Sequence, residues 1–200
     1  MSEVRTRVSN AGIFIPMLVS GIVCLIASFV LSVDAVKLAA NPGANLSCNI
    51  SAVLNCATVA NSDQANIFGF PNAFLGLMTE PVVITIAVAG LSGVVFKRWF
   101  MFIAQIVYGL GLVFAFWLFY QSSFNIGALC PWCLTITVFT TITFFTLLKY
   151  NVLNDNLFLS ATVSVGFKNL YKYGFHLSVI FLVLGVLFGV IIVKYGAFIF

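Results

Sequence analysis

Apolar residues gather in five long stretches that short polar segments separate. The stretches are Gly12–Val33, Asn72–Phe96, Trp99–Gln121, Ala128–Leu148 and Gly174–Val193. Each is close to the ~20 residues that an α-helix needs to cross ~30 Å of hydrocarbon. The pattern therefore predicts an all-α integral membrane protein with five spans. The first stretch is too long for the apolar core of a signal peptide, so we interpret it as a retained span.

Composition supports the membrane class. Hydrophobic residues make up 62% of the chain and charged residues only 7%. A soluble domain needs far more charge on its surface, whereas a surface that faces lipid excludes charge. The net charge of +4 is spread thinly, so nothing in the sequence predicts nucleic-acid binding.

The basic residues predict the orientation of the spans. A cytoplasmic N-terminus places seven basic residues inside and two outside, and the positive-inside rule favours this arrangement. The inner residues are Arg5, Arg7, Lys97, Arg98, Lys149, Lys168 and Lys172, and the outer ones are Lys37 and Lys194. The C-terminus and the long loop at 34–71 are then outside, where disulfides can persist.

Four cysteines belong to this outer side. Cys48 and Cys56 lie in the long loop, and Cys130 and Cys133 open the fourth span. Apolar residues at helical spacing predict a short amphipathic helix at 50–59, with Asn49 as its N-cap. One regular helix would separate Cys48 from Cys56 by ~12 Å, too far for a disulfide. We therefore expect Cys48 to lie on loop that folds back and faces solvent, while Cys56 faces the bundle.

The second pair, Cys130-Pro-Trp-Cys133, has the form of a redox motif. Pro131 suits the first turn of a helix, which makes Cys130 the expected N-cap. A sulfur near unpaired N–H groups is stabilised as thiolate, so we expect a lowered pKa for Cys130. Two other interpretations remain. Four sulfurs could bind zinc, or two structural disulfides could brace the outer side, although a Cys-x-x-Cys disulfide is easily reduced.

Glu80 and Cys24 lie within predicted spans. A charged side chain at mid-membrane costs about 2.5–3.5 kcal/mol by insertion scales, so Glu80 is a candidate functional residue. It could relay protons to a quinone, or it could be a protonated residue hydrogen-bonded between helices. Cys24 alone in an apolar span is typical of a small packing residue.

Taken together, these motifs resemble the vitamin K epoxide reductase (VKOR) family in its bacterial form. The shared features are a Cys-x7-Cys outer loop after the first span, Ser62 six residues past its second cysteine, Phe68-Gly69 before the next span, and Cys-x-x-Cys opening the fourth span. The resemblance covers about residues 10–150. It implies a four-helix domain over 1–150, followed by a cytoplasmic link and a fifth transmembrane helix over 151–200.

The resemblance also implies roles for individual residues. Cys130 and Cys133 would form the active-site pair, with Cys133 against a quinone ring. Cys56 would exchange with Cys130, and a thiolate of the partner protein would attack Cys48. The cofactor-binding residues would be Cys133, Ser62, Phe68 and Thr137. The implied activity is thiol oxidation coupled to reduction of ubiquinone or menaquinone, without a metal, which supports disulfide formation in exported proteins.

Two departures from the family pattern refine this expectation. Thr137 stands where animal members carry a tyrosine, which favours plain quinone reduction over epoxide chemistry. The chain ends at Phe200 without the thioredoxin-like domain of many bacterial relatives, so we expect that partner to be a separate exported protein. No ER-retention tail is present, and we expect a bacterial inner membrane.

Two further hypotheses stay open. A DsbB-type quinone oxidase would have the same chemistry, but its Cys-x-x-Cys motif is expected in the first outer loop, the reverse of this order. A non-enzymatic membrane protein could use the same cysteines only as structural disulfides.

Overall fold

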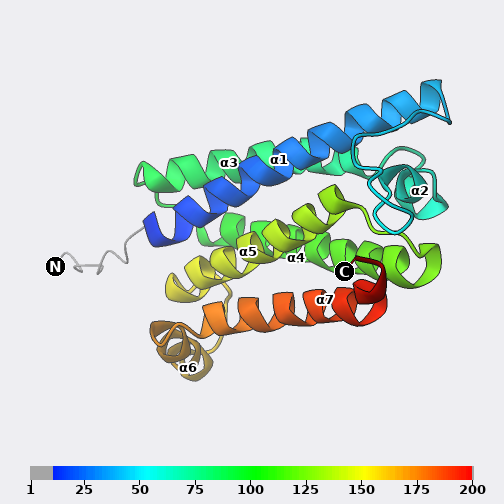
Figure 1. Ribbon diagram of the computed structural model, residues 1–200. Helices are drawn as coiled ribbons and strands as arrows, with labels where there is room; N and C mark the ends of the chain where they lie inside the picture. The colour runs from blue at the N-terminus through cyan, green and yellow to red at the C-terminus, as the bar shows by residue number, and fades with distance from the viewer. Residues whose placement is uncertain (1–10, 200) are drawn as a thin grey trace.

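Five long helices and two short ones make up the computed structural model, which describes residues 11–199 (Figure 1). The helices are α1 (Ala11–Ala40), α2 (Cys56–Ala60), α3 (Ala73–Leu91), α4 (Arg98–Tyr120), α5 (Pro131–Leu153), α6 (Ala161–Lys172) and α7 (Phe175–Ile199), with a 3₁₀ turn at Asp63–Asn66 and a π-turn at Gln121–Ile126. The five long helices are long and apolar enough to cross a membrane, which confirms the predicted fold class.

The connecting segments gather at the two ends of the bundle. Figure 1 shows α2 and the cysteine loop at one end, and α6 with the start of α1 at the other. The link between the fourth and fifth spans, for which no structure was predicted, contains α6. Arg5 and Arg7 lie outside the described residues. The predicted orientation, with the N-terminus inside and the C-terminus outside, remains a prediction.

The centre of the bundle is the contact of α1 with α3 and α5. Glycines on α3 bring it close to α1, because a Cβ at Gly90 would lie 2.4 Å from the ring of Phe14 and one at Gly76 only 2.0 Å from Ser28 Oγ. Phe14 is fully buried among Met17, Ala87 and other core residues. Helices in lipid associate through such close packing, since burial from water does not drive it. Cys24 of α1 is also fully buried, beside the Ile136 carbonyl of α5.

A buried amide network joins α4 to α5 near the α6 end. The Asn151 side chain donates hydrogen bonds to the Met101 carbonyl (3.1 Å) and to Gln105 Oε1 (3.0 Å). Asn156 donates in turn to Asn151 Oδ1 at 3.0 Å. Buried polar groups need such partners, so the network fixes the two helices and the start of the link relative to each other.

At the opposite end, α7 holds the turn that leads into α5. The Tyr195 hydroxyl of α7 donates to the Ser123 carbonyl at 2.7 Å. The π-turn containing Ser123 ends at Gly127, whose φ of +74° is left-handed and favours glycine. The chain then reverses through Ala128 and Leu129 into the fourth span, which places Cys130 beside the cysteine loop.

Substituting Gly90 by Ala should destabilise the protein, because the new methyl group collides with the buried ring of Phe14. Overpacking of this kind costs ~1–3 kcal/mol. Thermal unfolding of the purified protein in detergent should show a lower Tm than wild type. Gly185→Ala in α7 is the matched control, since among the described residues its added Cβ meets no atom within 4 Å outside its own chain neighbours and helix backbone. Equal Tm values for the two variants would contradict the tight α1–α3 contact.

Candidate functional site

Cys48 and Cys56 are joined in a disulfide, with their Cα atoms 5.6 Å apart. Cys48 lies in a turn and Cys56 is the first residue of α2, as the prediction of a folded-back loop requires. The predicted bounds of the loop helix, 50–59 with Asn49 as N-cap, were wrong. The helix begins only at Cys56, and its N-cap is Asn55, whose Oδ1 accepts from the Thr58 N–H at 3.0 Å.

The helix begins late because residues 53–55 bind another segment. The Asn55 N–H donates to the Leu129 carbonyl (3.0 Å), and the Leu129 N–H donates to the Val53 carbonyl (2.7 Å). Leu54 and Leu129 thus form a short parallel β-bridge. Asn49 still contacts the helix start, since its Oδ1 accepts from the Ala57 N–H at 3.1 Å. Sequence periodicity could not predict the bridge, because its backbone partners are distant in the chain.

Cys48 does not face solvent as predicted. Only 5% of its surface is exposed, and it packs with Leu38, Leu46 and Cys130. Its Sγ lies 3.9 Å from Oδ2 of Asp34, a buried carboxylate near the end of α1. Asp34 also pairs with Lys37 at 3.8 Å. This sulfur is therefore not accessible from solvent with the loop in this position.

Cys130 is the N-cap of α5, as predicted. Its Sγ accepts from the Cys133 N–H at 3.4 Å, and Pro131 occupies the first turn. The hydrogen bond from the Cys133 thiol lowers the pKa of Cys130 most, and backbone N–H groups add to this effect. Burial and the nearby Asp34 carboxylate oppose the shift, but the net direction of the pKa is downward. The thiolate of Cys130 is thus the stabilised form.

The two cysteine pairs meet at this helix end. Cys130 Sγ lies 3.4 Å from Cys56 Sγ, although the residues are 74 positions apart. The β-bridge between Leu54 and Leu129 explains the contact, because the bridge lies just before both cysteines. Cys130 and Cys133 are free thiols, whereas Cys48 and Cys56 are oxidised. This arrangement allows one sulfur of each pair to attack the other.

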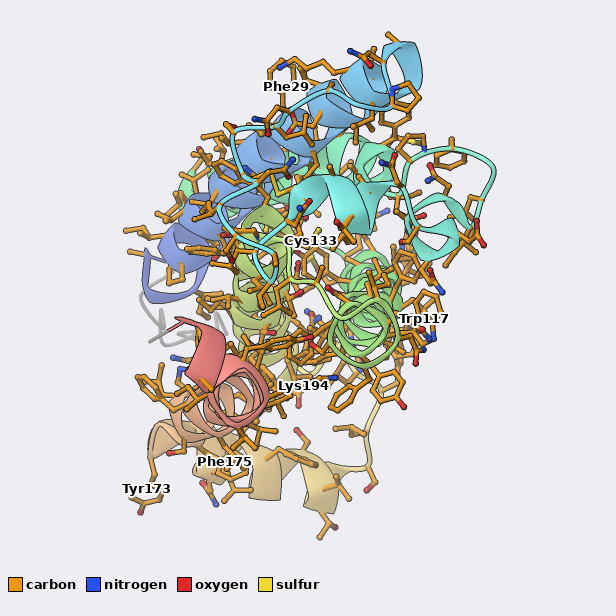
Figure 2. All side chains as sticks on the ribbon, turned by 45° about the vertical axis from the view of Figure 1, so that its right-hand side comes forward. Phe29, Trp117, Cys133, Tyr173, Phe175 and Lys194 are labelled. Atoms are coloured by element: carbon orange, nitrogen blue, oxygen red, sulfur yellow. A yellow bond between two sulfur atoms is a disulfide. The ribbon has the colours of Figure 1, made fainter. Side chains whose placement is uncertain are left out.

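A cavity of about 560 Å³ lies below the cysteines, surrounded by α1, α3, α4 and α5. Its volume is in the range typical of small-molecule sites, and its walls are mainly apolar. Cys56, Cys130 and Cys133 all line it. Figure 2 shows Cys133 in the interior of the bundle, whereas Phe29 and Trp117 lie at its outer surface.

Three of the four residues predicted to bind the cofactor line this cavity: Cys133, Ser62 and Thr137. The Ser62 hydroxyl donates to the Val59 carbonyl (2.6 Å), and that of Thr137 to the Cys133 carbonyl (3.0 Å), so both oxygens can only accept from a ligand. Phe68 does not line the cavity. It is 54% exposed and contacts Phe114, which does line it.

Asn72, Glu80 and Tyr108 also line the cavity. Of these, sequence reasoning singled out only Glu80, as a candidate proton relay to a quinone. Asn72, at the start of α3, donates to the Gln64 carbonyl at 2.7 Å. Glu80 on α3 is 5% exposed, and its Oε1 accepts from the Tyr108 hydroxyl of α4 at 3.3 Å. Asn72 Oδ1 and Glu80 Oε2 are buried and make no hydrogen bond within the described part of the chain. The mainly apolar walls fit the ring of a quinone, and Asn72 Oδ1 could accept a hydrogen bond from a hydroxyl group of its reduced form.

The arrangement of the four sulfurs fits zinc binding less well than it fits thiol–disulfide exchange. Two of them are bonded to each other, and a metal needs separate thiolates. Over residues 11–199, no group of three or more His, Cys, Asp or Glu side chains is placed to hold a metal ion.

A family model described as the vitamin K epoxide reductase family matches residues 15–148, which is more than half of the chain. The match includes all four cysteines of the site and the helices around the cavity. No curated protein matches the chain.

The C48A/C133A variant should form a disulfide between Cys56 and Cys130, because their sulfurs are already in contact. Mild oxidation with copper phenanthroline, digestion and mass spectrometry should detect the cross-linked peptide in most molecules. The C48A/C56A/C133A variant, which leaves Cys24 and Cys130, is the control and should form no intramolecular disulfide. Failure of Cys56 and Cys130 to cross-link would contradict the observed contact.

The Cys130 thiolate should persist to lower pH when Cys133 is present than when it is absent, because the Cys133 hydrogen bond is the main cause of the lowered pKa. Ultraviolet absorbance of the thiolate, titrated in C48A/C56A and in C48A/C56A/C133A, measures the difference. The midpoint should move to higher pH in the triple variant. Unchanged midpoints would show that the Cys133 side chain does not set this pKa.

Proposed function

Because the chain belongs to the vitamin K epoxide reductase family of membrane oxidoreductases, we propose that it oxidises the dithiol of an exported protein and transfers both electrons to a membrane quinone. The observation that most supports this function is the 3.4 Å contact between Cys56 and Cys130. It joins a disulfide at the rim of the bundle to a dithiol that lines the cavity.

Electron transfer proceeds by two thiol–disulfide exchanges. A partner thiolate attacks Cys48, and Cys56 leaves as a thiolate. The second partner thiol then attacks the mixed disulfide, so the partner is oxidised and Cys48 is released. Cys56 next attacks Cys130 of the oxidised inner pair, and Cys133 leaves as a thiolate. Finally Cys48 attacks Cys56 and releases Cys130, so two electrons have moved from the partner to Cys130 and Cys133.

The redox state of the cysteines in the structure is the one expected after the last exchange step, with the loop pair oxidised and the inner pair reduced. The N-cap position and lowered pKa of Cys130 make it the better leaving group from the Cys56–Cys130 disulfide. A quinone bound in the cavity would be the final acceptor of the two electrons, together with two protons. Cys133, Ser62 and Thr137 line that space, while Phe68 supports its wall through Phe114.

The proposed partner is a separate protein with a thioredoxin fold, located where the cysteine loop is exposed. We place this side outside the cytoplasmic membrane of a bacterium, with the N-terminus inside and the C-terminus outside. Residues 1–150 would form the catalytic domain and 151–200 the link and fifth span. Because Cys48 is buried, we expect the partner to displace the loop around it when it attacks.

Substituting Cys133 by Ala should abolish quinone reduction, lowering the rate by about a hundredfold or more, because the inner pair can no longer form its disulfide. The assay follows quinone absorbance with a reduced thioredoxin-fold donor and purified protein in detergent. Thr85→Val is a matched control, since Thr85 is exposed on α3 and bonds only the Pro81 carbonyl.

A purely structural role for the disulfides predicts a different outcome. The wild-type protein would then show no quinone-dependent thiol oxidation, and C133A would change only its stability. A C133A variant with full activity would instead contradict the role proposed for Cys133.

A further inference from the structure

Glu80 has no part in the exchange steps, yet it occupies the cavity that we assign to the quinone. It lies about two turns beyond the start of α3. The mainly apolar lining of the cavity also includes the hydroxyl groups of Tyr108, Thr140 and Thr143. The carboxyl group is buried, with 5% of the residue exposed. A buried carboxyl group without partners is unfavourable, so its hydrogen bonds need to be accounted for.

One of its two oxygens is accounted for. Oε1 accepts from the Tyr108 hydroxyl of α4 at 3.3 Å. The described residues contain two ion pairs, Asp34 with Lys37 and Asp155 with Lys168, and Glu80 belongs to neither. Without a cation, an apolar site favours the neutral acid. The acid then has a carbonyl oxygen, Oε1, that accepts from Tyr108, and a hydroxyl at Oε2.

The Oε2 hydroxyl has no acceptor among the described residues, although it is buried. A neutral carboxylic acid in an apolar site is suited to donate a hydrogen bond to a ligand oxygen. The same cavity contains Cys133, the thiol next to the proposed acceptor. Glu80 lines this cavity, so a turn of its carboxyl group would let Oε2 reach an acceptor on a molecule bound there, an acceptor that the described residues do not supply.

We propose that Glu80, oriented by Tyr108, donates a hydrogen bond from Oε2 to a carbonyl oxygen of the quinone, and so selects ligands that have a ring carbonyl. This inference rests on the proposed function. It assigns Glu80 a binding role toward the electron acceptor, and it assigns Tyr108 the role of a positioning residue. It also explains why α3 retains an ionisable residue in a span that would be more stable in lipid without it.

Binding to the fully oxidised protein tests the proposal without turnover, because both cysteine pairs are then disulfides. The probes are a short-chain menaquinone analogue and the same ring and chain without the two carbonyl oxygens. Fluorescence quenching or calorimetry in detergent gives Kd for each. Glu80→Leu should weaken quinone binding about tenfold, as expected for an unsatisfied carbonyl, and should leave the hydrocarbon unaffected. Glu80→Gln retains a donor and should stay within about threefold of wild type.

Infrared difference spectra give a second readout. The carbonyl stretching band of bound quinone, identified with an isotope label, should lie lower in wild type than in E80L, and E80Q should differ from both. Gln is polar and similar in size to Glu, so we expect E80Q to fold. The bands of E80Q and wild type can therefore be compared even if E80L is not recovered as folded protein. Thr85→Val, on the same helix but outside the cavity, should match wild type in every measurement.

Equal quinone affinities in E80L and wild type would overturn the inference, and so would loss of quinone and hydrocarbon binding together, which would indicate a structural role. Identical carbonyl bands in wild type and E80Q would also overturn it. If wild-type protein bound quinone but never reduced it with a thiol donor, the proposed function would fail while the assignment of Glu80 stood.

Discussion

The site depends on two backbone hydrogen bonds between Leu129 and the segment 53–55. Neither bond involves a cysteine, yet together they hold the segments that carry Cys56 and Cys130 side by side. A loop of this length has many conformations, and closing it onto one geometry has an entropic cost. The bridge, the Asn49 and Asn55 caps and the disulfide each remove some of that freedom. The sulfur contact is thus a product of ordinary backbone pairing.

A second constraint is the polarity of the cavity, whose walls are mainly apolar but include a few polar atoms. Apolar side chains from four helices make a space that suits a lipid-soluble molecule, and three of the cysteines line it. The close α1–α3 packing at Gly76 and Gly90 brings α3 against α1 and helps to form the cavity wall. Helix α7 lies outside this wall. It supports the site through the Tyr195–Ser123 hydrogen bond and through the packing of Leu187 and Ile191 with Leu129.

Much of the architecture could be predicted from the sequence, because hydrocarbon thickness sets the length of each apolar stretch. The N-cap position of Cys130 could be predicted for a similar reason, since Pro131 has a strong local preference for the first helical turn. The loop helix was predicted too long, because its periodic apolar residues face a β-bridge that local sequence does not reveal. The burial of Cys48 and the position of Phe68 outside the cavity depend on tertiary packing. The spacing of residues in the sequence does not reveal such packing. Asn72 and Tyr108 gave no sequence signal beyond their polarity within apolar stretches.

Cys130 caps the first turn of α5 with the same sulfur atom that would react in the proposed exchange. As a thiolate, this atom is a charged acceptor for the N–H groups at the helix start, and as half of a disulfide it is a neutral and weak one. The order of that helix end therefore varies with the oxidation state of the protein. The sulfur of Cys130 would thus serve both the proposed electron transfer and the stability of the helix start. We expect the first turn of α5 to become less ordered and then ordered again in each catalytic cycle.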